Sequence, residues 1–191
     1  MKKVFLDCGA HKFEGLREFI PILNLDEDWE VHSFEANPTI NLNMEARMDP
    51  SWPFKLTVWR CGVGAEQGVM KFVSEGLADE GGQGSRVLKN WHEGVYSFPG
   101  GKIYETPIIR LSSFIRDTFS EDTSIVMKFD IEGSEFDIIE DFVANGLPPQ
   151  IHTMYVEWHE RFFPPELNMA AKRVEYSKFL TDSGIELHDW K

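Results

Sequence analysis

Short apolar segments alternate with amphipathic ones along most of the chain. An apolar segment too short for a helix predicts a strand, and apolar residues three or four positions apart predict a helix. Strands are predicted in this way over 4–6, 29–34, 56–61, 106–111, 125–130, 151–158 and 185–190. Strands that alternate with helices pair in parallel, so we expect an α/β, Rossmann-like, doubly wound and mostly parallel sheet with helices on both faces.

The first two predicted helices follow from apolar spacing and from capping residues. The first has one apolar face, made of Leu16, Phe19, Ile20 and Leu23. Pro21 lies within that spacing and should end or kink the helix. After the second strand, Asn37 should cap a helix that begins at Pro38. Its buried side is expected to hold Ile40, Met44 and Met48.

Three further helices are predicted in the second half. The first of them should bury Leu111, Phe114, Ile115 and Phe119. Ser112 or Ser113 is a candidate cap for it. The next spans 134–145, with Glu135 and Asp137 as favourable charges in its first turn and Gly146 as its end. The last spans 165–182 and should bury Leu167, Ala170, Ala171 and Val174.

Length and composition indicate one domain over residues 1–191. The chain has 191 residues, of which 42% are hydrophobic, enough for one sizeable core. A glycine-rich segment at about 74–101 is longer than the usual loop between two secondary-structure elements, so it is either a functional lid or a mobile loop. Its candidates for substrate contact are Arg86, Trp91, His92 and Tyr96, although for any one of them a solvated loop with a few anchoring aromatic residues is the preferred interpretation.

The formal net charge of -13 argues against two classes of partner. Neither nucleic acid nor an anionic membrane surface would attract such a chain. No apolar run is long enough to span a bilayer, and Asp7 interrupts the first one before it could serve as a signal-peptide core. Cys8 and Cys61 both lie in strand-like surroundings, so we expect reduced cysteines in a cytoplasmic protein.

Polar residues gather at the carboxyl ends of the predicted strands, which in an open α/β sheet is the ligand-binding edge. They are Asp7, Glu35, Asp130, Glu132, Glu157 and His159. Gly9 and Ala10 follow the first strand and leave room for a ligand close to the backbone, beside the free N–H groups of a helix. A carboxylate that ends the second strand, here Glu35, can accept both ribose hydroxyls of a nucleoside.

Four segments together resemble the FkbM-type S-adenosylmethionine-dependent methyltransferases. They are 7–10 (DCGA), 34–38 (FEANP), 128–135 (KFDIEGSE) and 156–159 (VEWH). The resemblance implies a class I methyltransferase fold, a first turn that holds the methionine part of the cofactor, and Glu35 as the ribose ligand. Members typically methylate hydroxyl groups, often on sugars or other secondary metabolites. The cofactor-binding residues we predict are Asp7, Gly9, Ala10, His11, Gly15, Glu35, Ala36, Val63 and Asp130.

The first turn departs from the family pattern. Where members usually have Asn and then Gly, this chain has His11 and Phe13, and a glycine follows only at Gly15. The bulky Phe13 bears on the path of the turn and on cofactor affinity.

Methyl transfer from a sulfonium to a hydroxyl is an in-line displacement, which a base assists. Asp130 and His159 are the candidates for that base, and Glu132 and Glu157 are expected to orient them or to bind substrate hydroxyls. An equally simple role for Glu132 and Glu135 is to stabilise a helix N-terminus. A magnesium or manganese ion on Asp130, Glu132, Glu157 and His159 is possible but not favoured, because the ligands come from separate elements without a fixed spacing.

Two other functional classes remain open at this stage. A nicotinamide-dependent dehydrogenase would also use a glycine turn and an acid after the second strand, but it normally shows Gly-x-Gly-x-x-Gly and a separate catalytic domain. A catalytically silent nucleoside-binding module of the same fold is favoured by one feature, Phe13. The expected acceptor is a small molecule or a carbohydrate, and the sequence does not set the oligomeric state.

Overall fold

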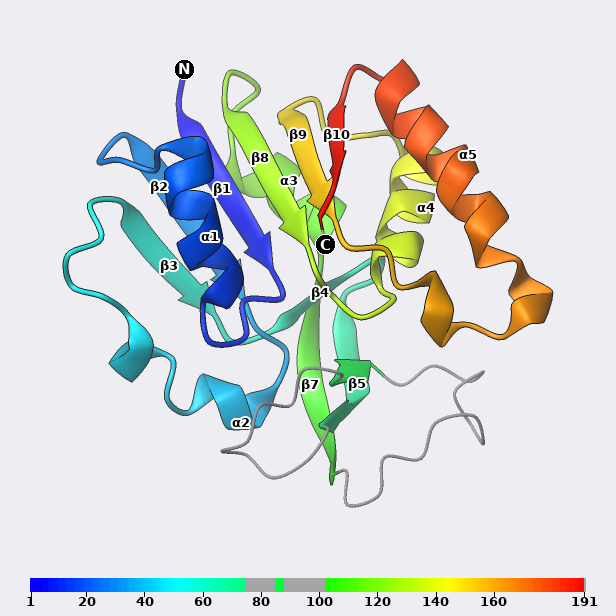
Figure 1. The fold of residues 1–191 in the computed structure, drawn as a ribbon, viewed down its shortest axis with the longest axis horizontal. Coiled ribbons are helices and arrows are strands. Elements are labelled where there is room, and N and C mark those ends of the chain that lie inside the picture. The colour runs from blue at the N-terminus through cyan, green and yellow to red at the C-terminus, as the bar shows by residue number, and fades with distance from the viewer. Residues whose placement is uncertain (75–84, 88–101, 191) are drawn as a thin grey trace.

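The larger sheet is parallel throughout. The computed structural model describes residues 1–74, 85–87 and 102–190. In this sheet the strands lie in the order β10-β9-β8-β1-β2-β3 (Figure 1), and each neighbouring pair is parallel. Their bounds are β1 Lys3–Cys8, β2 Trp29–Phe34, β3 Lys55–Trp59, β8 Ser124–Phe129, β9 Ile151–Val156 and β10 Glu186–Asp189. The α/β fold class predicted from the sequence is confirmed.

The register of the central strands brings their carboxyl ends together. β1 pairs with β2 on one side and with β8 on the other, so that Cys8 lies opposite both Phe34 and Phe129. After β3 the chain crosses to the far side of β1 to form β8, so the strand order reverses between β1 and β8. The loops after these strands therefore leave the sheet in different directions, which opens a crevice at this edge.

Helices cover both faces of the sheet (Figure 1). The described helices are α1 Glu14–Leu23, α2 Pro38–Asn41, η1 Glu45–Arg47, α3 Leu111–Thr118, α4 Glu135–Asn145, η3 Glu160–Phe162, η4 Pro165–Leu167 and α5 Met169–Asp182. On one face, α1 packs Phe19 against Phe5 of β1. On the other face, α3, α4 and α5 bury residues such as Ile115, Phe136 and Leu180 in one cluster with β1 and β8. Among the described residues, none of these helices has the length and apolar character needed to cross a membrane.

A second, smaller sheet extends from the carboxyl edge of the first. Its order is β4-β7-β5-β6, with bounds β4 Gly62–Gly64, β5 Gly68–Ser74, β6 Arg86–Val87 and β7 Lys102–Arg110. β5 pairs antiparallel with β7, and β4 pairs parallel with it. Phe72 and Ile108 form a small core of their own beside Ala36. Trp91, His92 and Tyr96 lie outside the described residues, as does most of the predicted insertion at about 74–101; for Arg86 the backbone in β6 is described.

Two predictions for the first two helices need correction. Pro21 does not end α1, which runs on to Leu23, because Asn24 still donates its N–H to Ile20 and buried Phe19 anchors the last turn. The helix predicted after Pro38 breaks into α2 and η1, because Asn41 turns its side chain to Glu35 O at 2.8 Å instead of extending the helix. Its start is confirmed, since Asn37 Oδ1 accepts from Thr39 N at 3.0 Å.

The face predicted for the last helix is wrong. Leu167 lies before the helix, in η4, and Val174 is 70% exposed. The buried residues of α5 are Met169, Tyr176 and Leu180, which pack towards Phe136 of α4. Neither Ser112 nor Ser113 caps α3; the Ser112 hydroxyl instead donates to Asp141 Oδ2 at 2.5 Å and ties α3 to α4.

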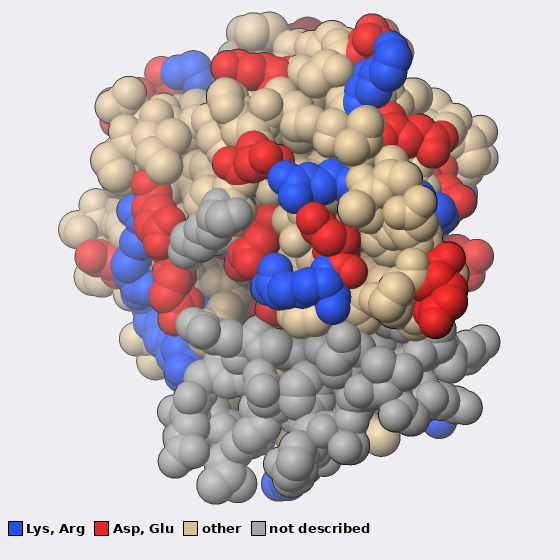
Figure 2. All heavy atoms as spheres, turned by 45° about the vertical axis from the view of Figure 1, so that its right-hand side comes forward, with Lys and Arg blue, Asp and Glu red and all other residues tan. Residues whose placement is uncertain are grey.

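Several basic side chains on one face of the molecule lie next to acidic ones. Figure 2 shows this on one face, where blue and red side chains adjoin one another over the described residues. Arg173, for example, contacts Glu160 and Asp189 at 2.9 Å each. Positive charge is therefore balanced locally where such pairs form.

Candidate active site

A cavity of about 470 Å³ opens at the carboxyl edge of β1, β2 and β8. This volume lies within the usual range for small-molecule sites. The loops after these strands line it, together with Gly62 and Val63 of β4 and the start of α1. Of the residues predicted from the sequence, Gly9, Ala10, His11, Gly15, Glu35, Ala36, Val63, Asp130, Glu132 and Glu157 line the cavity.

The first turn requires a glycine at position 9. Gly9 has φ +88°, and a Cβ there would lie 1.8 Å from Asp130 O, so any side chain would collide with the loop after β8. The N–H groups of Gly9 and Ala10 both donate to Phe34 O, at 3.1 and 2.9 Å. These contacts tie the turn after β1 to the ends of β2 and β8.

Phe13 keeps the backbone conformation that a glycine would favour in the same turn. Its φ is +64° and ψ 23°, in the left-handed region, immediately before α1. Its side chain is fully buried and packs edge-on against Trp52, with ring centroids 5.6 Å apart. Phe13 is not among the residues that line the cavity. Phe13, which stands where the family usually has a glycine, therefore places its ring in the hydrophobic core and not in the cavity.

Glu35 is held by backbone N–H groups at both of its oxygens. Oε2 accepts from His11 N at 2.7 Å, and Oε1 accepts from Asn37 N at 2.6 Å. Burial raises the pKa of Glu35, and the two N–H donors oppose that rise in part. Each oxygen of a carboxylate can accept a further hydrogen bond, so Glu35 can still receive two hydroxyls from the cavity.

Lys128 is an important site residue for which the sequence analysis proposed no role. Its side chain is 1% exposed, and Nζ donates to Gly9 O at 2.7 Å. The same nitrogen lies 3.2 Å from Asp7 Oδ1 and 3.4 Å from Asp130 Oδ2. Burial works against the charged form, but Asp7 and Asp130 outweigh it and raise the pKa of Lys128. A lysine within an apolar strand was the signal in the sequence, since a buried lysine requires partners.

Asp7 lies beneath the first turn. It is fully buried, accepts a hydrogen bond from Ser33 Oγ at 3.2 Å, and pairs with Lys128. It is not among the residues that line the cavity. In this arrangement Asp7 acts on the turn through Lys128, whose ammonium group binds Gly9 O.

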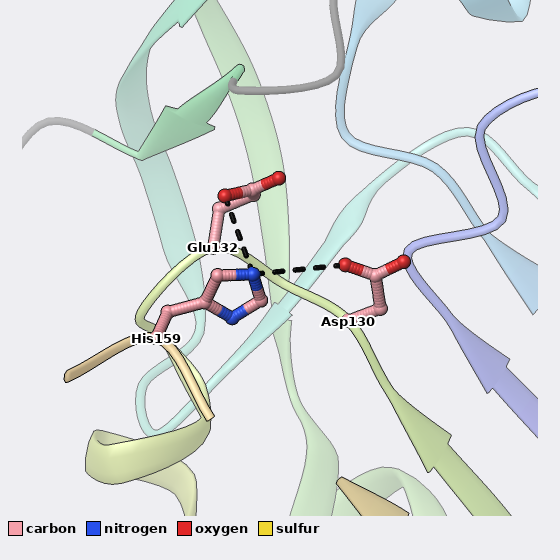
Figure 3. Close-up of side chains that lie close together, drawn as sticks. All are labelled: Asp130, Glu132 and His159. Atoms are coloured by element: carbon pink, nitrogen blue, oxygen red, sulfur yellow. Dashed lines mark ion pairs between the residues drawn. The ribbon is translucent and has the colours of Figure 1, made fainter. Parts of the chain in front are cut away.

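An acidic cluster surrounds His159 beside the cavity (Figure 3). His159 Nε2 lies 3.4 Å from Glu132 Oε2, 3.5 Å from Glu157 Oε1 and 3.9 Å from Asp130 Oδ1. The histidine is 1% exposed and is not among the cavity-lining residues, whereas these three carboxylates are. The structure thus brings together all four residues that the sequence analysis considered for catalysis.

Glu135, like Lys128, has a role in the site that the sequence analysis did not predict. It was assigned to the helix N-terminus, where it does begin α4, but its side chain is fully buried. Its Oε1 accepts from His159 N at 2.8 Å and lies 3.1 Å from His159 Nδ1. Its Oε2 accepts from Gly133 N at 2.9 Å. Glu135 therefore fixes the orientation of the imidazole.

The charges of the cluster shift two pKa values. Burial, reinforced by Asp130 and Glu157 and opposed by His159, raises the pKa of Glu132 to about 7. Burial alone would lower the pKa of His159, but its contact with Glu135 and the charges of Glu132 and Glu157 outweigh burial and raise it. Asp130, Glu132 and His159 also offer ligand atoms within 4.8 Å of one another, a spacing within reach of one metal ion.

The family model of the methyltransferase FkbM domain matches residues 7–179. The chain belongs to the FkbM methyltransferase family. The match includes the first turn, Glu35, Lys128 and the cluster around His159. A comparison with curated proteins gave no significant match.

One solved structure similar to this chain is that of methyltransferase FkbM from Methylobacillus flagellatus KT. The two chains are 20% identical with a TM-score of 0.41, and the similarity covers 72% of this chain and 28% of that one. The matched part of this chain thus spans less than a third of the length of that chain.

Proposed function

We propose that this protein transfers a methyl group from S-adenosylmethionine to a hydroxyl of a sugar or another small metabolite. The observation that carries the proposal is the position of Glu35. Its carboxylate lies at the end of β2, lines the cavity, and is fixed by N–H groups of His11 and Asn37. In a chain of a methyltransferase family, such a carboxylate suits the two ribose hydroxyls of a nucleoside cofactor.

The residues around the cavity fit this cofactor. Gly9 lets the turn pass close to the backbone of Asp130, and Gly9, Ala10, His11 and Gly15 all line the cavity beside that turn. Glu35 retains acceptor capacity for both ribose hydroxyls. We assign the methionine part to Gly9, Ala10, His11 and Gly15, with Lys128 and Asp7 supporting the turn, and the nucleoside part to Glu35, Ala36 and Val63.

The acidic end of the cavity suits the acceptor. When bound, S-adenosylmethionine supplies a methyl group on a positively charged sulfur; the C–S bond breaks as the C–O bond forms, and its electron pair stays on sulfur. Asp130, Glu132 and Glu157 line the cavity and can hold acceptor hydroxyls and take up the proton that the reacting hydroxyl loses. His159 is buried behind them, so in this assignment it acts by positioning the carboxylates.

Cofactor binding tests the first half of the proposal. S-adenosylmethionine and S-adenosylhomocysteine should raise the melting temperature, whereas NAD should not. Glu35→Ala should abolish the shift, and Glu27→Ala, which removes an exposed carboxylate of the same kind, should leave it unchanged. A shift with NAD and none with the two sulfur compounds would overturn the proposal.

Turnover tests the second half. With methyl-labelled S-adenosylmethionine and a panel of monosaccharides and hydroxylated metabolites, label should appear in an O-methyl product. Asp130→Asn should lower the rate on the order of a hundredfold, the usual effect of losing a general base, while cofactor binding changes little. If the protein binds the cofactor but transfers label to no compound of the panel and to none in an extract of its source organism, it is the catalytically silent module considered above.

A further inference from the structure

The imidazole of His159 is arranged as metal-bound histidines usually are. Its Nδ1 lies 3.1 Å from Glu135 Oε1, and the side chains of both residues are almost completely buried. Its Nε2 points the other way, towards Asp130 and Glu132 (Figure 3). A carboxylate that holds one ring nitrogen fixes the tautomer and leaves the lone pair of the other nitrogen free for a metal.

Glu132 provides a second observation that points to a cation. Its Oε2 is buried and, among the residues that the structure describes, has no hydrogen-bond partner. His159 Nε2 lies 3.4 Å away, near but not in hydrogen-bonding geometry. A buried carboxylate oxygen without a partner is costly unless a cation or another donor compensates it.

The spacing of the ligand atoms fits one divalent cation. At metal–ligand distances of about 2.1 Å, octahedral ligands lie about 3.0 Å apart when adjacent and about 4.2 Å apart when opposite. Nε2 lies 3.4 Å from Glu132 Oε2 and 3.9 Å from Asp130 Oδ1, and all three ligand atoms lie within 4.8 Å. Bringing both carboxylate oxygens to adjacent positions would need contractions of about 0.4 Å for Glu132 and about 0.9 Å for Asp130. Glu157 Oε1 lies 3.5 Å from Nε2 and also contacts Arg161 at 3.4 Å, so it is near the site but already has a cationic partner.

We propose that Asp130, Glu132 and His159 bind one divalent cation of the magnesium or manganese class, and that this cation binds the acceptor hydroxyl. Oxygen ligands with a single imidazole suit these ions. A cation at this point would hold the acceptor oxygen and polarise its O–H bond, beside the part of the cavity assigned to the cofactor. The role in transfer rests on the proposed methyltransferase function, whereas the binding of the cation does not.

The site departs from the sequence-based expectation, which did not favour a metal. That expectation relied on the absence of a fixed spacing between ligands. In the fold, β8 and β9 are adjacent and parallel, so the loops that follow them bring Asp130 and Glu132 to His159. Proximity comes from strand pairing, which a motif with fixed spacing does not describe.

Direct metal titration tests the proposal without any cofactor or acceptor. The full chain, freed of metal with EDTA and then of EDTA by gel filtration, is titrated with Mn²⁺, and free Mn²⁺ is followed by its EPR signal. We expect one site per chain, competed by Mg²⁺. Glu132→Gln and His159→Ala should each weaken Mn²⁺ binding at least tenfold, and Glu135→Gln should weaken it about 10-fold to 100-fold through the lost support of the imidazole.

Matched measurements separate the outcomes. Glu166→Gln removes an exposed carboxylate outside the cluster and should bind Mn²⁺ as the parent does. Circular dichroism checks that each variant folds, and if His159→Ala does not, Glu132→Gln decides alone because it keeps the side-chain shape. Absence of binding at millimolar Mn²⁺, or binding that Glu132→Gln leaves unchanged, would overturn the cation site and show that His159, with Lys128 and Arg161, balances the carboxylates.

The cofactor measurement is made separately in EDTA. Binding of S-adenosylhomocysteine in EDTA without any Mn²⁺ site would remove the cation proposal and leave the proposed function intact. Binding of Mn²⁺ to the cluster without binding of S-adenosylhomocysteine would support the cation site and overturn the proposed function.

Discussion

Gly15 in α1 lies directly against the buried end of Lys128. A Cβ at position 15 would come within 2.9 Å of Lys128 Cε and 3.0 Å of Nζ. The ammonium group cannot move aside cheaply, because it binds Gly9 O and lies between two carboxylates. The absence of a side chain at Gly15 therefore leaves room for Lys128, and Lys128 stabilises the first turn through its hydrogen bond to Gly9 O.

Replacing Gly15 with alanine should lower stability, against the usual trend for helices. Alanine is ordinarily better than glycine in a helix by about 1 kcal/mol. Here we expect a loss of about 1–2 kcal/mol in the free energy of unfolding, measured by urea denaturation, because the contacts of Lys128 must shift. Gly68→Ala is the control, since a Cβ there meets nothing within 4 Å. A Gly15→Ala protein more stable than the parent would show that Lys128 yields without cost.

Lys128→Met should destabilise the fold by about 3–5 kcal/mol, because it leaves the carboxylate of Asp7 buried without its cation. Adding Asp7→Asn should restore part of that loss, so the double variant should be more stable than the sum of the single effects predicts. Urea denaturation of the four proteins gives the coupling energy. Additive effects would mean that the ammonium group does not stabilise Asp7.

The strands of the large sheet could be predicted because their signals are local. Each is a short apolar run between turn residues, and burial on both faces makes the run almost continuous. The partners of Lys128 could not be predicted in the same way. Gly9 lies 119 residues from it in the sequence, and the contact exists because β8 pairs in register with β1. A lysine in a buried strand predicts that charged or polar partners exist, but the sequence does not show which residues they are.

The last helix illustrates a different limit. Apolar spacing selected a face with Val174, yet the structure buries Tyr176 and Leu180. An isolated helix pattern with several apolar residues on different sides does not say which side meets the neighbour. Here Phe136 of α4 decides, since Tyr176 packs beside it with ring centroids 6.3 Å apart. Likewise, the position of carboxylates at strand ends was foreseeable, but the attachment of Glu135 to His159 depends on the loop after β9.

Cofactor affinity should depend on pH through Glu35. Burial raises the pKa of this carboxyl, so the acidic form is populated at higher pH than in an ordinary glutamate. The ionised form accepts two ribose hydroxyls best; hence affinity for S-adenosylhomocysteine should be constant above the raised pKa and fall by up to about tenfold per pH unit below it.

Isothermal titration calorimetry across acidic to neutral pH measures this dependence. Glu35→Gln carries no titrating group and presents an amide N–H₂ to backbone donors, so it should bind at least tenfold more weakly at neutral pH and show a flatter profile. The same pH dependence in parent and variant would assign the titration to another group.

Phe13→Gly decides whether the unusual first turn limits the cofactor site. The substitution relieves a left-handed conformation that costs a non-glycine residue about 1–2 kcal/mol. It also removes a fully buried ring that packs against Trp52, a loss of about 3–5 kcal/mol. The burial loss is larger, so the variant should be less stable than the parent by about 1–4 kcal/mol. Because the ring faces the core, affinity of the folded variant for S-adenosylhomocysteine should stay within about twofold. A marked gain in affinity would mean instead that Phe13 holds the turn away from its binding geometry, the behaviour expected of a module that has lost its activity.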